Sequence, residues 1–423
     1  MTKFKTLVAL VGLSILTGCT TSTLIVKDVD VSTKRKQAES AVASYGLSIP
    51  DGDKKLRTYN PNGKGLGYID YETRNQTPAP TNLCKHRYLG TESFLVRGSH
   101  TPILKLLGNN VSFFETQDQL QFANPGLPVA AEFNMLIMEV FYYNDLGEEE
   151  KKIEALNKLK SFLIKIKDEN YFSELIPDGP VYGYQEVFGN LRETLVLIIQ
   201  GFAIARDGHI LSATEDKQIH DWVEKLVAST VMLGNEGANS QGALVPGIHV
   251  ELQKGLVFAL WGSVANDKLY YQAGIKSFMV GLSQSRSDGS HQFEIRDIRD
   301  SSERSSNGLK LQAQVVGYMS IIAEIAKNNG QDLYELKTYN GASLATMQNF
   351  LAYASLNDID LPHIKSVKMQ RYFLLSKDND AKSLAWYVPV YKKTKVNIFG
   401  EYFNTNINYA SLGLGGSLNC FIR

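Results

Sequence analysis

The chain has 423 residues, of which 43% are hydrophobic, so it is long enough for two ordinary domains or for one large helical body. Lysine and arginine total 44 and aspartate and glutamate also total 44, which excludes a general attraction to nucleic acid or to anionic lipid. An anionic partner must therefore be bound by a local cluster of basic residues.

The N-terminal segment predicts export. Two lysines precede the apolar run 7–16, which is too short to span a bilayer. Leu16-Thr17-Gly18-Cys19 resembles a bacterial lipobox, and this resemblance implies a signal peptide over residues 1–18 and lipidation of Cys19. Because Thr20 stands where an aspartate would favour inner-membrane retention, we expect an outer-membrane lipoprotein that faces the periplasm or the cell surface.

Residues 19–83 are interpreted as a lipid-anchored tether and an entry segment to the main domain. A basic cluster at 34–36 is followed by proline- and glycine-rich turn signals at 50–52, 60–63 and 77–80. Turn-forming pairs at this density argue against long regular elements. A lipid-anchored protein needs such a spacer to hold its body away from the membrane.

From about residue 127 the sequence predicts a succession of amphipathic helices. The clearest covers 148–168, where apolar residues recur at helical spacing and lysines occupy the other face. Ser212 and Glu215 have the spacing of a capping box and predict the start of another helix. The remaining expected helices cover 129–146, 187–206, 249–264, 267–285, 309–328, 342–355 and 363–375.

This long helical run has no heptad repeat and indicates stacked antiparallel helix pairs. An open solenoid and a closed ring of hairpins both fit the pattern, although no repeat motif supports the solenoid. Strand signals are confined to the tail, where 396–399 and 401–404 are predicted to pair as a short hairpin.

Besides Cys19, the chain contains Cys84 and Cys420. In an oxidising compartment these two would form a disulfide that clasps the ends of the main domain, and two unpaired thiols are the alternative. Two distant cysteines and seven scattered histidines do not supply the local ligand pairs that zinc requires. We therefore expect no metal and no cofactor.

Two features carry possible chemistry. His249 opens an apolar helix after a glycine-rich loop. Farther along, Arg296, Arg299 and Arg304 lie on a polar segment that leads into a helix. Guanidinium groups in this arrangement would neutralise carboxylates on a polymeric substrate, and the alternative is a solvated loop with ordinary surface arginines.

Several segments, in order and spacing, resemble the alginate lyase family of (α/α)-toroid polysaccharide lyases. Tyr88-Leu89-Gly90-Thr91-Glu92-Ser93, followed by Arg97, is similar to the Tyr-x-Gly-Ser-Asp-x segment of the family. His249 stands where the family has the histidine of its Asn-Asn-His motif. The segment from Asp288-Gly289-Ser290 to Arg296 resembles Asp-Gly-Ser-Phe-Pro-x-Glu-Leu-x-Arg, and Ala385-Trp386-Tyr387 resembles a late Ala-Trp element.

The resemblance covers roughly residues 87–395. It implies an all-α fold, an incomplete (α/α) toroid of antiparallel helix hairpins over 84–395, with a short β tail over 396–423. It further implies β-elimination on an acidic, uronate-containing polysaccharide, by a protein that we expect to be a monomer. In that reaction the carboxylate must be neutralised and the C5 proton removed.

The resemblance also implies roles for individual residues. His249 would act as the base or the neutralising group, Arg296 would bind the carboxylate, and Gln312 would be a further donor. The expected substrate contacts are Tyr88, Arg97, Tyr184, Arg299, Arg304 and Trp386.

The sequence departs from the family pattern at two positions. Ile248 stands where the neutralising asparagine is expected, and no tyrosine lies between Glu294 and Tyr318, where the family has its proton-shuttling tyrosine. These departures favour a second hypothesis, a non-catalytic polysaccharide-binding or export-assisting lipoprotein that retains the lyase fold. An open helical scaffold that binds a protein partner is a third.

Overall fold

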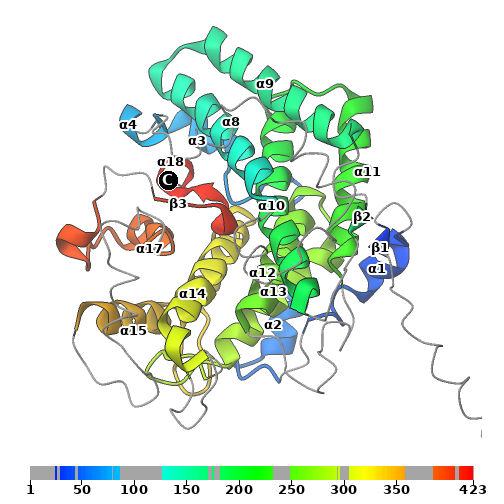
Figure 1. Ribbon diagram of the computed structural model, residues 1–423. Helices are drawn as coiled ribbons and strands as arrows, with labels where there is room; N and C mark the ends of the chain where they lie inside the picture. The colour runs from blue at the N-terminus through cyan, green and yellow to red at the C-terminus, as the bar shows by residue number, and fades with distance from the viewer. Residues whose placement is uncertain are drawn as a thin grey trace, which may run out of the picture.

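The computed structural model is shown in Figure 1, and it describes twelve stretches of the chain. These are residues 24–25, 29–42, 46–78, 80–85, 126–169, 174–175, 182–231, 248–292, 294–295, 304–357, 384–404 and 409–422.

Eight long helices form the body of the molecule. They are α8 (Gly126–Leu146), α9 (Glu149–Asp168), α10 (Tyr182–Asp207), α11 (Ala213–Ser229), α12 (Ile248–Val264), α13 (Lys268–Ser283), α14 (Arg304–Asn328) and α15 (Leu344–Leu356). Consecutive helices pair along the chain, α8 with α9, α10 with α11, α12 with α13 and α14 with α15. The first members of the pairs also contact one another in the order α8, α10, α12, α14, which makes an inner row covered by α9, α11, α13 and α15 (Figure 1).

The composition of each helix explains its place. In the inner helix α12 every residue from Glu251 to Val264 is buried, as expected for a helix that is apolar on all sides. The outer helix α9 buries one stripe, Ala155, Leu156, Leu159, Leu163 and Ile166, and exposes its lysines. Outer helices therefore show the periodicity that sequence alone detects.

Glycines set the distance between α12 and α13. A Cβ atom at Gly262 would lie 2.1 Å from the backbone nitrogen of Tyr271, and one at Gly274 would lie 2.3 Å from that of Ala259. Any larger side chain at either position would force the two helix backbones apart, because interiors pack at near-crystalline density.

The expected all-α fold is confirmed, and the eight long helices match the predicted ranges closely. The main differences are at two N-termini, since α10 begins at Tyr182 rather than at 187 and α14 begins at Arg304 rather than at 309. The predicted helix at 363–375 lies outside the described residues. None of the described helices is long and apolar enough to cross a membrane.

Residues 19–83 form short folded elements where the structure describes them, and the lipid anchoring of this segment stays a prediction. Short helices, α1 (Val31–Gln37), α2 (Gly52–Thr58), α3 (Tyr71–Gln76) and α4 (Thr81–Cys84), alternate with turns, as the turn signals predicted. The segment nevertheless packs on the helical body. Lys34 donates to the carbonyl oxygen of Val231 at 3.0 Å, Arg35 forms an ion pair with Asp267, and Ile49 is buried in the core. Farther toward the N-terminus, β1 (Leu24–Ile25) pairs antiparallel with β2 (Glu174–Leu175).

The C-terminal region is also mostly helical. Its elements are α17 (Tyr387–Thr394), the 3-10 turn η5 (Gly400–Tyr402), β3 (Ala410–Ser411), the 3-10 turn η6 (Leu412–Leu414), β4 (Gly416–Ser417) and α18 (Leu418–Phe421). The short β tail is confirmed as the antiparallel pair β3–β4. The predicted hairpin of 396–399 and 401–404 is wrong, because Phe399 and Phe403 both turn inward against Tyr387, at ring distances of 4.8 and 4.9 Å.

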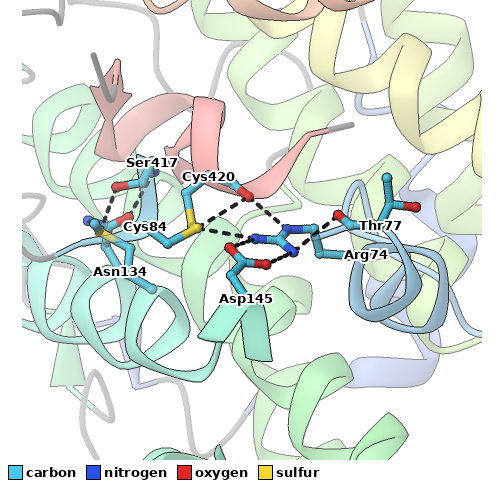
Figure 2. Close-up of a disulfide and its surroundings, with 8 residues drawn as sticks. Arg74, Thr77, Cys84, Asn134, Asp145, Ser417 and Cys420 are labelled. Atoms are coloured by element: carbon cyan, nitrogen blue, oxygen red, sulfur yellow. Dashed lines mark hydrogen bonds and ion pairs between the residues drawn. A yellow bond between two sulfur atoms is a disulfide. The ribbon is translucent and has the colours of Figure 1, made fainter. Parts of the chain in front are cut away.

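A disulfide between Cys84 and Cys420 joins α4 to α18, with 4.9 Å between the Cα atoms (Figure 2). Beside it, both terminal nitrogens of Arg74 lie 2.7 Å from the carboxylate oxygens of Asp145 on α8, and its Nε donates to the carbonyl oxygen of Cys420 at 2.9 Å. The bridge is therefore part of a buried clasp that joins the segment 74–84, the C-terminal residues and α8. A disulfide that closes so long a loop stabilises a fold by about 2–5 kcal/mol.

Replacing Arg74 with Met should strongly destabilise the protein. The side chains of Arg74 and Asp145 are 1% and 0% exposed, so the substitution leaves a buried carboxylate without its guanidinium, at a cost of about 3–5 kcal/mol in unfolding free energy. Urea unfolding followed by circular dichroism measures the change. The exposed pair Lys217–Asp221 is the control, and Lys217→Met should change stability little. Equal effects of the two substitutions would contradict the clasp.

Candidate functional site

The first turn of α12 holds a histidine–carboxylate pair. His249 Nδ1 lies 2.9 Å from Glu294 Oε1, and the backbone N–H of His249 donates to the same oxygen at 3.2 Å. The His249 side chain is 25% exposed, whereas Glu294 is fully buried. A carboxylate on Nδ1 keeps the proton on that nitrogen, so Nε2 is left as the nitrogen that can accept an external proton.

Glu294 stays ionised although it is buried. Burial by itself raises the pKa of this carboxyl, but the hydrogen bonds that it accepts from the ring and the backbone of His249 outweigh that effect and lower the pKa. The carboxylate also lies at the N-terminus of α12, where the helix dipole favours a negative charge. The other oxygen, Oε2, is buried and has no hydrogen-bond partner among the described residues.

A second histidine faces the same carboxylate. His291 is completely buried, and burial lowers the pKa of its imidazole to about 4, although the charge of Glu294 and a hydrogen bond with the backbone of Gly281 oppose this shift. His291 is consequently neutral at physiological pH. Of the two histidines, only His249 is partly open to solvent.

The loop that carries His291 is held by Gln312 on α14. The Gln312 amide donates to the carbonyl oxygen of Gly289 at 2.9 Å, and its oxygen accepts from the backbone N–H of His291 at 3.0 Å. Gly289 has φ +90°, and a Cβ atom there would lie 2.2 Å from the carbonyl oxygen of Thr346. Gln312 was expected to donate to a substrate carboxylate, but it is fully buried and supports this loop instead.

A polar cluster lies one helical turn farther along α12. Gln253 follows His249 by four residues, on the same helix face, and its amide nitrogen lies 3.4 Å from Glu193 Oε1 on α10. Gln253 also hydrogen-bonds Tyr318 on α14. Three inner helices thus each contribute one side chain, while Arg192 on α10 lies close enough for its charge to act on Tyr318.

Burial controls the charges in this cluster. It raises the pKa of Glu193 to about 7, and the hydrogen bond with Gln253 opposes the shift only in part. Burial likewise raises the pKa of Tyr318, assisted by the charge of Glu193. It lowers the pKa of Arg192 to about 10, against the charges of Glu251 and Tyr318. Tyr318 therefore keeps its proton, and Glu193 is poised near neutrality.

The structure does not describe the side chains of most other site residues predicted from sequence. Tyr88, Arg97, Arg296 and Arg299 lie outside the described residues, as does Cys19. Tyr184 and Arg304 lie in the first turns of α10 and α14, and their side chains are not described.

Trp386 was expected to stack on a sugar, but it is buried. Its ring makes edge-to-face contacts with Tyr387 and Phe399. Trp386 therefore belongs to the core under the C-terminal region.

The sequence alone predicts no role for Glu193, Gln253, Glu294 or Tyr318. A usable signal for Gln253 was its position four residues after His249, on the same face of the helix. The partnership of His249 with Glu294 joins residues 45 apart and has no local signal. Among the described residues, no group of three or more His, Cys, Asp or Glu side chains could hold a metal ion.

The buried His291 predicts a pH dependence of stability. Its folded-state pKa of about 4 lies below the ordinary value of 6.5, so between these values the unfolded chain binds a proton that the folded chain does not. The unfolding free energy should fall as pH drops from 6.5 to 4, by at most about 1.4 kcal/mol per pH unit from this group. Denaturant unfolding of the wild type and of His291→Gln across this range isolates the effect, since the variant lacks the titrating ring. Parallel curves for the two proteins would contradict it.

Comparisons with known proteins agree with this architecture. Residues 185–360 match the family model described as alginate lyase. Alginate lyase A1-III from Sphingomonas species A1 superposes with a TM-score of 0.57 at 12% identity, over 90% of this chain and 99% of that one. A Tyr-to-Phe variant of alginate lyase A1-III complexed with a tetrasaccharide gives a TM-score of 0.59 at 13% identity, over 87% and 98% of the two chains.

A His-to-Ala variant of the same enzyme, also complexed with a tetrasaccharide, gives a TM-score of 0.58 at 13% identity, over 90% of this chain and 99% of that one. No curated protein sequence matches the chain. The resemblance expected from the motifs is confirmed: residues 185–360 match the alginate lyase family, and the chain has the (α/α)-toroid fold of alginate lyase A1-III.

Proposed function

We propose that this protein cleaves an acidic, uronate-containing polysaccharide by β-elimination. The observation that carries the proposal is the His249–Glu294 pair, in which a buried carboxylate orients a partly exposed imidazole. A base of this kind is what removal of a weakly acidic proton requires. The alginate lyase match over residues 185–360 supports a uronate as the substrate.

In the proposed reaction, His249 Nε2 removes the C5 proton of the uronate, and the electron pair moves toward the neighbouring carboxylate. The C4–O4 bond then breaks, a C4=C5 double bond forms, and O4 leaves with a proton. No water is consumed, and one proton is taken up for each one that is delivered. Glu294 is a positioning residue, because it touches His249 rather than the sugar and balances the imidazolium that forms.

The departing oxygen needs a proton donor. Tyr318 is the tyrosine that shares the cluster with Gln253, one turn from His249. It is only 4% exposed, and because burial raises its pKa its hydroxyl stays protonated until a strong base, such as the departing alkoxide oxygen, accepts the proton. Tyr387, another candidate, is engaged with the backbone of Val396 and Ile398. We assign the donor role to Tyr318, with Glu193 as the neighbouring carboxyl able to return the proton near neutral pH.

The remaining parts of the proposal come from sequence. Arg296, Arg299 and Arg304 would neutralise substrate carboxylates, and Tyr88, Arg97 and Tyr184 would bind the polymer. Lipidation of Cys19 would anchor the protein, which we assign to the outer membrane, facing the periplasm or the cell surface.

One observation favours the non-catalytic alternative. Ile248, at the position of the family's neutralising asparagine, is a buried core residue and offers no hydrogen-bond donor from its side chain. In that case the toroid binds the polysaccharide without cleaving it. Affinity electrophoresis in polysaccharide gels, run beside the activity assay, separates the two functions: retardation without product supports binding alone.

Incubation with polymannuronate, polyguluronate and other polyuronates should produce unsaturated ends that absorb in the ultraviolet. His249→Ala should lower kcat/KM by about 10²–10⁴-fold, the usual contribution of a general base. Glu294→Gln should lower kcat with little change in KM, and Glu294→Asp should restore part of the rate. His209→Asn, at an exposed position with φ +55°, is the control. A folded wild type that is inactive on all the polymers would remove the enzymatic proposal.

Tyr318→Phe should abolish most turnover while polymer binding is retained, because the ring remains and only the hydroxyl is lost. Tyr271→Phe is the matched control, since Tyr271 is also buried and its hydroxyl donates to Gln331 Oε1 at 2.8 Å on another part of the fold. Initial rates, gel retardation and thermal melting are measured for both. If Tyr318→Phe keeps the wild-type rate, the proton donor lies elsewhere, and the assignment of His249 is unaffected.

A further inference from the structure

Exposed apolar side chains gather on the turn that follows α17. We call residues 395–402 the tail turn. Val396, Ile398 and Tyr402 are 56%, 37% and 40% exposed, and they are three of the seven large hydrophobic residues that the described chain exposes. Figure 1 shows α17 and this turn at the left margin of the molecule, where α17 contacts α14.

Hydrogen bonds from Tyr387 and Asn397 fix the backbone of the tail turn that carries these side chains. The Tyr387 hydroxyl donates to the carbonyl oxygen of Val396 and accepts from the backbone N–H of Ile398 at 3.0 Å. The Asn397 amide donates to the carbonyl oxygens of Gly400 and Phe403 at 3.0 and 2.9 Å.

The rings of Phe399 and Phe403 pack beneath the turn, on the side that faces the core. Both are buried, and Phe403 stacks on Tyr409 with 4.6 Å between ring centroids. The outward direction of Val396 and Ile398 is therefore built into the fold.

The charges around the tail turn are mainly positive. Lys392, Lys393 and Lys395 directly precede the exposed aliphatic residues, and Glu401 is the one acidic residue between 392 and 402. Lys393 lies 3.5 Å from the carboxylate of Asp332, so its charge is partly compensated. Lys395 is exposed and forms no ion pair within the described part of the chain.

We propose that the tail turn is a membrane-contact surface, which inserts Val396 and Ile398 at the boundary of an anionic phospholipid bilayer. Aliphatic tips and a tyrosine beside lysines are the composition that favours this interface, where apolar groups enter the acyl region and cations meet the headgroups. A polysaccharide would instead need hydrogen-bonding side chains, which Val396 and Ile398 lack. The contact is distinct from any lipid anchor at Cys19 and does not depend on catalysis.

The test places a tryptophan on the tail turn of the full chain. Val396→Trp and, as a second variant, Ile398→Trp are mixed with vesicles that contain brominated phosphatidylcholine and phosphatidylglycerol. The native tryptophans are all buried, so quenching by the brominated acyl chains reports the introduced residue. Ile153→Trp on α9, where the native side chain is 47% exposed, is the matched control. Because the readout is local, attachment through another segment does not imitate it.

Fluorescence at 396 and 398 should be quenched several-fold more than at 153. The quenching should decrease in vesicles without phosphatidylglycerol, in high salt and in a variant that also carries Lys395→Gln, because the attraction is partly electrostatic. Thermal melting checks that each variant is folded. Equal quenching at 153 and at the tail turn, or no quenching at all, overturns the proposal. It is also overturned if polymannuronate, rather than vesicles, shifts the emission at 396.

Discussion

Helix α12 is enclosed on every side beyond its first turn, and the arrangement of the other helices depends on this constraint. The backbones of α12 and α13 are in direct contact at Gly262 and Gly274, and α10 and α14 pack against other sides of α12. A helix buried in this way can expose a polar side chain only at its end. His249 occupies that end, where it reaches both a buried carboxylate and solvent.

The inner helices hold two carboxyl groups in contrasting environments. Glu294 accepts hydrogen bonds from the backbone N–H and the ring of His249 at the N-terminus of α12, and these bonds lower its pKa. Burial raises the pKa of Glu193 to about 7, because the amide of Gln253 compensates it only in part. Environments that separate two pKa values divide the roles of proton acceptor and proton donor. This division is the physical basis for giving His249 and Tyr318 different tasks.

Sequence periodicity located the helices because outer helices such as α9 need a soluble face, which leaves a readable stripe. It failed in the tail, because the aromatic and branched residues around Phe399 have strand propensity. In the structure Phe399 and Phe403 instead pack against the ring of Tyr387, and the segment forms a turn. Periodicity also missed the attachment of the N-terminal segment, where each short helix buries few side chains. At the site, the histidine was predicted by resemblance, but its partner Glu294 comes from a distant loop that only the tertiary fold brings close.

The disulfide between Cys84 and Cys420 turns most of the chain into a covalent ring. A protease that cuts the chain once between residues 85 and 419 opens this ring but releases no fragment, because both new ends remain linked through the bridge. The buried position of the two cysteines protects that link as long as the clasp around Arg74 is intact. A nicked molecule would therefore keep its composition and separate into pieces only after reduction.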